Sequence, residues 1–93
     1  MIKIVAKNTV KKENKADFIN TAKELIEKSR AEEGCISYTL NESLDGKYLT
    51  FIEEWKYEKS IEMHNNSEHF KSIVPKLSQF KEGDMDVILY KEI

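Results

Sequence analysis

The sequence contains few cysteine, proline and glycine residues, which form disulfides, interrupt helices and strands, and add backbone flexibility. It has one cysteine, one proline and three glycines among 93 residues. The single cysteine, Cys35, has no partner for a disulfide within the chain, which favours a cytoplasmic location. No apolar run approaches the roughly 18 residues that a membrane-spanning helix needs, and residues 1–10 lack the pattern of a signal peptide. We therefore expect no association with a membrane.

The sequence also lacks an excess of positive charge and the common nucleotide-binding motifs. Its 15 lysine and arginine residues stand against 17 aspartate and glutamate residues, for a net charge of -2. A nucleic-acid-binding face is normally basic, so nucleic acid is not an expected partner. The glycine-rich phosphate loop, the dinucleotide fingerprint and the G-x-S-x-G motif are all missing. An enzyme with this sequence would not bind a nucleotide through one of these motifs.

Hydrophobic periodicity predicts one domain over residues 1–93, built from strands and helices in alternation. Alternating apolar and polar residues predict four strands, at residues 1–10, 35–43, 48–55 and 84–92. Apolar residues at helical spacing predict a helix with Asn14 as its N-cap and Gly34 as its C′ residue. Two shorter helices are expected at residues 60–65 and 67–77.

Two local signals refine this pattern. Asp45 and Gly46 predict a tight hairpin turn between the second and third strands, because Asp-Gly readily takes the positive φ angles of such turns. Pro75 should kink or shorten the last helix.

The element order β-α-β-β-α-α-β predicts an α+β fold of the ferredoxin-like, split β-α-β type, with an antiparallel four-stranded sheet. The third and fourth predicted strands carry apolar residues on both faces, as Leu49 and Phe51 against Tyr48 and Ile52 illustrate. Helices cover only one face of such a sheet, so the other face needs a second cover. A homodimer in which two sheets pack face to face would supply it.

Residues 48–70 hold the only tryptophan and both histidines. Trp55, at the end of a strand, is either a core residue or the wall of a pocket for a flat ligand with its N–H as a donor. Asn8 shares a strand face with Ile4 and Ala6, so its amide either satisfies a loop backbone or points into a cavity.

The two histidines, His64 and His69, do not have the spacing of residues that share a helix face, and no specific cysteine or carboxylate set accompanies them. We expect no metal site. Histidine titrates near neutral pH and suits general-base chemistry, and His64 is the better candidate because it lies on the predicted buried side with Ile61. His69 should point sideways. The adjacent Glu53 and Glu54 point to opposite faces of their strand and do not form a paired-carboxylate site. One is expected in a salt bridge at the dimer interface and the other in solvent.

The sequence resembles the antibiotic biosynthesis monooxygenase family over nearly its whole length. The resemblance rests on the segments Ile4–Val10 (IVAKNTV), Phe51–Trp55 (FIEEW) and Ser60–Phe70 (SIEMHNNSEHF), and on the helix around Pro75. Its most telling part is the pattern E-x-W-x(8)-H from Glu53 to His64. The resemblance implies a ferredoxin-like domain that dimerises into an α+β barrel.

The resemblance also implies oxidation of a quinol- or anthrone-like aromatic substrate by O2, with no metal or flavin cofactor. In that reaction the substrate is its own reductant, so the site needs an apolar slot, a base and oxyanion donors. Asn8, Trp55 and His64 are then the expected catalytic residues, with His64 as the base. The expected substrate contacts, besides Trp55, are Phe18, Tyr38, Phe51, His69, Phe70 and Val74.

Other functions occur within the same family. Its haem-degrading members use a histidine where this sequence has about Val74, so haem degradation is not favoured. A regulatory dimer that binds a small molecule without catalysis, and an isomerase of a small metabolite, are the alternatives to an oxygenase.

Overall fold

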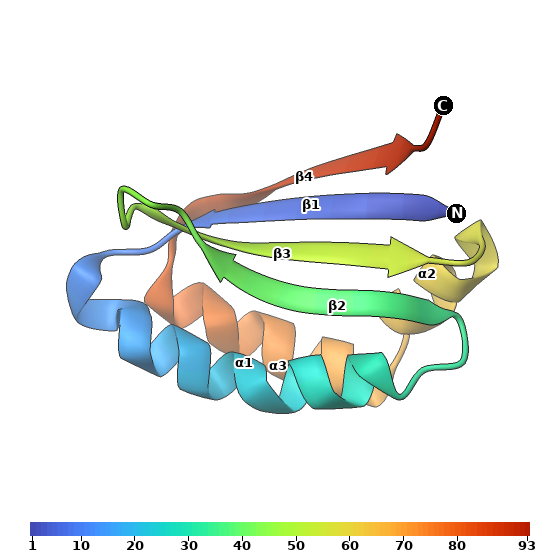
Figure 1. The fold of residues 1–93 in the computed structure, drawn as a ribbon. Helices are drawn as coiled ribbons and strands as arrows, with labels where there is room; N and C mark the ends of the chain where they lie inside the picture. Colours follow the sequence, from blue (N-terminus) through green and yellow to red (C-terminus); the bar gives the residue numbers. More distant parts are fainter.

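The computed structural model describes residues 1–93 and has the predicted element order (Figure 1). The elements are β1 (Ile2–Thr9), α1 (Lys15–Arg30), β2 (Cys35–Glu42), β3 (Tyr48–Trp55), α2 (Glu58–Asn65), α3 (Glu68–Leu77) and β4 (Glu82–Lys91). Short 3-10 turns precede α1 at Lys12–Asn14 and follow α3 at Ser78–Phe80. None of the helices has the length and apolar composition to cross a membrane.

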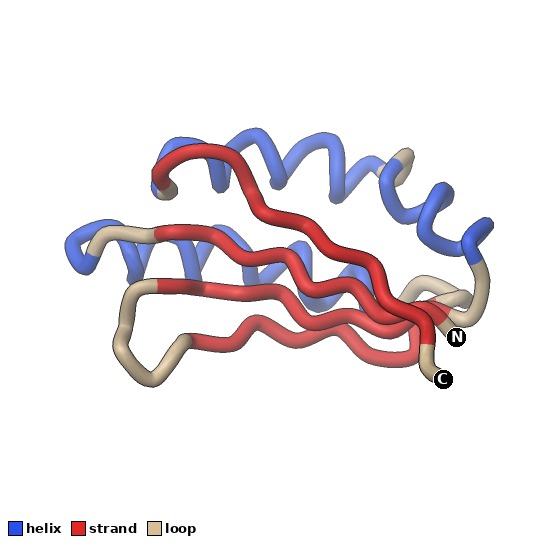
Figure 2. The backbone as a smooth tube through the Cα atoms, turned by 90° about the horizontal axis from the view of Figure 1, so that it is seen from above, coloured by secondary structure: helices blue, strands red, loops and turns tan.

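The strands form one antiparallel sheet in the order β2-β3-β1-β4, with β1 and β3 at its centre. The helices lie against one face of this sheet, and α1 and α3 run beside each other beneath it (Figures 1 and 2). This arrangement confirms the predicted α+β, ferredoxin-like fold. The Asp45–Gly46 turn is also confirmed: Gly46 has a φ of 77°, and the Asp45 carboxylate accepts hydrogen bonds from the Ser43 hydroxyl and the Lys47 N–H.

The end of α1 differs from the prediction. The helix stops at Arg30, and Gly34 is not among the glycines with positive φ, so it is not a helix C′ residue. Gly34 instead lets α2 approach the backbone, since a Cβ there would lie 1.9 Å from the Ser60 hydroxyl oxygen. The early stop leaves Glu32 in the segment that joins α1 to β2. At the other end of α1, Asn14 holds the N-cap position but its side chain makes no capping hydrogen bond.

The core lies between the sheet and the helices. Trp55, Phe18 and Ala22 are fully buried there, together with Leu25, Leu49 and Phe51. The Ser67 hydroxyl caps α3 by accepting a hydrogen bond from the Phe70 N–H, as the sequence predicts. Beyond Pro75, α3 continues only to Leu77 before it tightens into the 3-10 turn.

The opposite face of the sheet carries no helix. Val5 pairs there with Ile52 on β3 and Ile88 on β4, and the last two side chains are 41% and 46% exposed. We call Val5, Ile52, Ile88 and Tyr90 the open-face patch. Ile36 does not share a face with Tyr38 and is exposed, because a register shift between Cys35 and Ser37 interrupts the alternation of β2.

Candidate functional site

A cavity of about 250 Å³ lies between the helix-covered face of the sheet and helices α2 and α3. Hydrophobic side chains form most of its wall, and its few polar side chains are Asn8, Glu53, His64, Asn65 and Lys81. Val87 and Leu89 of β4 line the cavity and are still about half exposed, which places its opening at the β4 edge of the sheet. An apolar cavity with a few convergent polar groups is the usual form of a small-molecule site.

The structure brings most of the predicted site residues to this cavity. Those that line it are Asn8, Tyr38, Phe51, His64, Phe70 and Val74. Phe18 does not, because it is fully buried in the core beside Phe51. His69 also lies outside the cavity, on the far side of His64, where it lines a separate polar hollow.

Trp55 is not a pocket wall either. It is fully buried, and its ring packs against His64 and Tyr38, at centroid distances of 4.6 Å and 6.3 Å. Its indole N–H donates a hydrogen bond of 2.9 Å to Glu53 Oε1. The expectation that this N–H is a free donor for substrate is therefore wrong. Trp55 instead contacts three residues that line the cavity, His64, Tyr38 and Glu53.

The amide of Asn8 is similarly occupied. Its Nδ2 donates to the Leu49 carbonyl at 3.2 Å and to the Ala6 carbonyl at 3.4 Å. Both amide hydrogens thus bind strand backbone, and only Oδ1, an acceptor, is left for the cavity. The prediction that Asn8 donates to a developing oxyanion does not fit this geometry.

Glu53 is a cavity residue that sequence reasoning did not assign to the site. Strand alternation places it on the covered face with Trp55, and it is 5% exposed. Burial raises the pKa of its carboxyl to about 7, against the opposing effect of the Trp55 hydrogen bond. Its neighbour Glu54 lies on the open face, where it faces Lys3 Nζ at 3.7 Å. Strand alternation could have indicated that Glu53 shares the buried face of Trp55, because the two residues are two positions apart.

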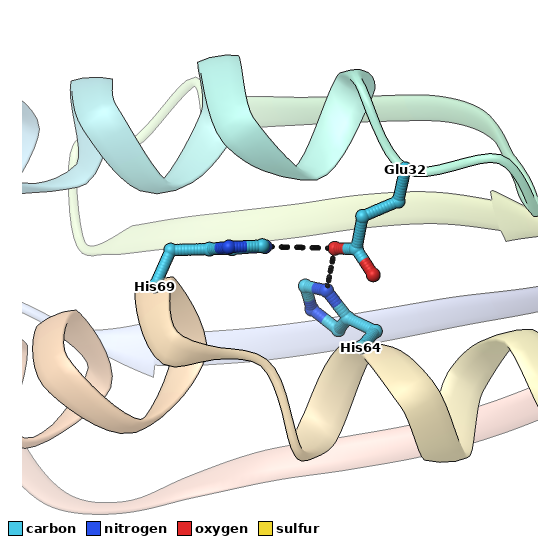
Figure 3. Close-up of side chains that lie close together, drawn as sticks. All are labelled: Glu32, His64 and His69. Atoms are coloured by element: carbon cyan, nitrogen blue, oxygen red, sulfur yellow. Dashed lines mark hydrogen bonds and ion pairs between the residues drawn. The ribbon is translucent and has the colours of Figure 1, made fainter.

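The two histidines meet at a carboxylate that lies far from them in the sequence (Figure 3). Glu32 Oε2 is 2.6 Å from His64 Nδ1 and 2.8 Å from His69 Nε2. The break between α2 and α3 allows this convergence, because the chain turns at Ser67, whose hydroxyl donates to the His64 carbonyl. The expectation that no specific carboxylate accompanies the histidines is therefore wrong, whereas His69 does point away from the cavity, toward Glu32.

The protonation of His64 follows from its burial. Burial lowers the pKa of His64, while the hydrogen bond to Glu32 acts in the opposite direction. A neutral His64 donates Nδ1–H to the carboxylate, so its Nε2 is the basic nitrogen. That Nε2 is buried and has no hydrogen-bond partner. Glu32 does not line the cavity and His64 does, so Nε2 is the ring nitrogen that is not held by Glu32 on a residue of the cavity wall.

The donor atoms of Glu32, His64 and His69 lie within 4.8 Å of one another, a spacing that a divalent cation could bridge. Both short contacts are equally well explained as imidazole N–H groups that donate to one carboxylate oxygen. The Nε2 of His64 takes no part in either contact and has no hydrogen-bond partner.

Comparisons with known proteins agree with this fold. A family model described as antibiotic biosynthesis monooxygenase matches residues 1–76. The Bacillus subtilis (strain 168) protein named "Putative monooxygenase YcnE" is 37% identical over 90 residues, covering 95% of this chain and 94% of the relative. The crystal structure of a conserved protein from Methanosarcina mazei Go1 shares 42% identity with a TM-score of 0.96, covering 99% of this chain and 92% of that one. A crystal structure of an antibiotic biosynthesis monooxygenase shares 30% identity with a TM-score of 0.93, covering 100% and 99% of the two chains.

Proposed function

Because the chain belongs to the antibiotic biosynthesis monooxygenase family, we propose that it oxidises a hydroquinone-like aromatic substrate with O2, using the substrate as its own reductant. The observation that carries this proposal is the unpartnered Nε2 of His64 beside an apolar cavity. A buried basic nitrogen without a partner costs free energy, and a substrate hydroxyl would satisfy it.

The size of the cavity favours a small aromatic substrate. An apolar protein cavity of roughly 150 Å³ holds one benzene molecule, and this cavity has about 250 Å³. One ring or two fused rings would fit inside it. A three-ring anthrone would extend through the opening beside Val87 and Leu89, so we favour quinols over anthrones. The same size argues against haem, as does Val74 on the cavity wall.

The chemistry begins with a proton transfer. His64 Nε2 accepts the proton of a phenolic hydroxyl, and Glu32 stabilises the resulting imidazolium through Nδ1–H. The phenolate is a stronger reductant than the phenol and transfers one electron to O2. The substrate radical and superoxide then combine into a peroxide at a ring carbon. No added cofactor is needed to supply electrons for this sequence.

The open-face patch supports the proposal of a homodimer. Exposed apolar side chains at the centre of a sheet face are unusual in a monomer, and a second copy would cover them through a two-fold axis. Charged residues such as Lys7 and Asp86, whose side chains are 3.9 Å apart, flank the patch as a rim would.

A binding protein without turnover is the second candidate. It is favoured by the occupied N–H groups of Asn8 and Trp55, which leave few donors for a reaction that develops negative charge. An isomerase of a polar metabolite is disfavoured by the apolar wall.

An oxygen electrode separates these candidates. The parent protein is mixed with chemically reduced one-, two- and three-ring quinones, and O2 uptake is corrected for autoxidation. We expect uptake that is proportional to protein and fastest with one- or two-ring hydroquinones. Tight binding of the same compounds without protein-dependent uptake would contradict the oxygenase and identify the binding protein.

A further inference from the structure

Loss of water from the peroxide needs a base and an acid in the same step, and His64 can serve there only as the base. Breaking the O–O bond of the peroxide expels a hydroxide, which must receive a proton to leave as water. We propose that Glu53 is the general acid that delivers this proton. The role rests on the proposed oxygenase function and adds a catalytic residue to it.

The position of Glu53 fits this role. One oxygen, Oε1, is fixed by the Trp55 N–H at 2.9 Å, and Oε2 makes no hydrogen bond within the protein. The carboxyl lines the same cavity as His64 and is 5% exposed, so bulk water does not replace it as the proton donor. The Trp55 hydrogen bond fixes the orientation of the carboxyl and leaves Oε2 without a protein partner.

The raised pKa of Glu53 agrees with a role as a general acid. Burial and the negative charge of Glu32 raise the pKa of its carboxyl to about 7, and the Trp55 hydrogen bond opposes them. An acid with a pKa near the working pH is efficient, because a substantial fraction is protonated and the group is still acidic enough to donate. Tyr38 also faces this region, but burial raises the pKa of its phenol, so it is a poorer donor.

The reaction balances with these two groups. His64 first takes the O–H proton of the hydroquinone and returns it to the peroxide, which gives a ring carbon bearing hydrogen and O–OH. His64 then removes the C–H proton, the C–O bond becomes a carbonyl, and the O–O bond breaks. Glu53 protonates the departing hydroxide to water. Transfer of the proton from His64 to the Glu53 carboxylate restores both groups, and one O2 has oxidised one hydroquinone to a hydroxyquinone and water.

The test compares Glu53→Gln with Glu54→Gln. The Glu53→Gln side chain keeps an oxygen for the Trp55 N–H but cannot donate an acidic proton, and the Glu54 change removes a neighbouring carboxyl from the open face. With a reduced two-ring quinone as substrate, O2 uptake, hydroxylated product and released peroxide are measured in the same reaction. We expect Glu53→Gln to form product roughly 10²–10³-fold more slowly, with uptake that continues and peroxide that accumulates. Glu54→Gln should behave as the parent.

Several outcomes would overturn the inference. Unchanged product formation in Glu53→Gln, without peroxide, would remove the acid role while the oxygenase function stands. Loss of uptake and product together, in a folded variant that still binds substrate, would place Glu53 in the first proton transfer instead. If Glu53→Gln does not fold, Glu53→Asp keeps an acid with a shorter reach and should show partial peroxide release; full coupling there would contradict the required position. A parent with no uptake would refute the oxygenase function itself.

Discussion

The two faces of the sheet come from the same strands but differ in every property that matters for function. On the covered face, Glu53 is buried and hydrogen-bonded to Trp55. One residue later, Glu54 lies at the open face, where Lys3 is its partner. Surface ion pairs of this kind contribute little to the free energy of unfolding. Burial of the Glu53 carboxyl, by contrast, raises its pKa. A two-residue period alone can thus separate the face that lines the cavity from the face that carries the open-face patch.

The polar groups of the two faces are also arranged differently. On the covered side they form connected pairs and triads that leave single atoms free: Nε2 of His64 and Oε2 of Glu53. On the open side, apolar residues such as Val5 and Ile52 are flanked by exposed ion pairs. The first arrangement suits chemistry on a small molecule and the second suits contact with a protein surface. The following changes would break or sharpen this contrast, from the largest expected effect to the smallest.

Removing the base on the covered face should have the largest effect. His64→Ala is expected to lower the rate of quinol oxidation by roughly 10²–10⁴-fold, the usual contribution of general acid–base catalysis, while the fold remains. His69→Ala is the control: it touches Glu32 but not the cavity, so its effect should be much smaller. Steady-state O2 uptake measures both. Equal activity of His64→Ala and the parent would remove His64 from the mechanism.

Charging the open face should dissociate the proposed dimer without changing the cavity. Ile52→Asp would place a carboxylate in each half of a desolvated contact, and we expect the dimer dissociation constant to rise roughly 100- to 1000-fold. Leu44→Asp, in the fully exposed hairpin turn, is the matched control. Sedimentation velocity reports the result. A parent that sediments only as a species of 10.9 kDa at micromolar concentration would contradict the dimer.

The buried carboxyl should leave a signature in the pH dependence of stability. Glu53 ionises near pH 4.5 when unfolded and near 7 when folded, so the unfolded state binds fewer protons between these values. Parent stability therefore falls as pH rises through this window, by up to about 3 kcal/mol. Glu53→Gln lacks this loss, so its unfolding free energy relative to the parent should rise from pH 4.5 to 7. Urea unfolding across this range measures it, and a constant difference would show that Glu53 has an ordinary pKa.

A smaller effect is expected at Trp55. Trp55→Phe keeps most of the aromatic volume, so stability should change by only about 1–2 kcal/mol. Loss of the indole N–H removes the bond that lowers the pKa of Glu53, so that pKa should rise further. The carbonyl stretch of the protonated carboxyl, followed by infrared titration, reports the shift. A lower pKa in Trp55→Phe would contradict the hydrogen bond.

The fold was predictable because its signals are local. Strand alternation, the Asp45–Gly46 turn and the Ser67 cap each depend on residues close together in the sequence. The cavity residues Asn8 and His64 were also predictable, since periodicity and the family resemblance pointed to them. The local signal at Gly34 was misleading, because this glycine does not end a helix. Its lack of a side chain leaves room for the close approach of Ser60.

The polar connections of the site were not predictable in the same way. Glu32 meets His64 only after α1, α2 and α3 pack, and no spacing in the sequence marks that contact. The alternation that separates Glu53 from Glu54 was visible, but which face is buried depends on where the helices lie. The engaged donors of Trp55 and Asn8 likewise depend on three-dimensional neighbours, so their availability could not be judged from residue type.

The proposed chemistry of the covered face is the insertion of one oxygen atom of O2 into an aromatic substrate. Labelling with ¹⁸O2 tests it most directly, in a reaction of the parent protein with a reduced two-ring quinone, followed by mass spectrometry of product and water. We predict one labelled oxygen in the hydroxyquinone and the other in water. Both labelled atoms in hydrogen peroxide, with an unlabelled quinone product, would contradict oxygen insertion.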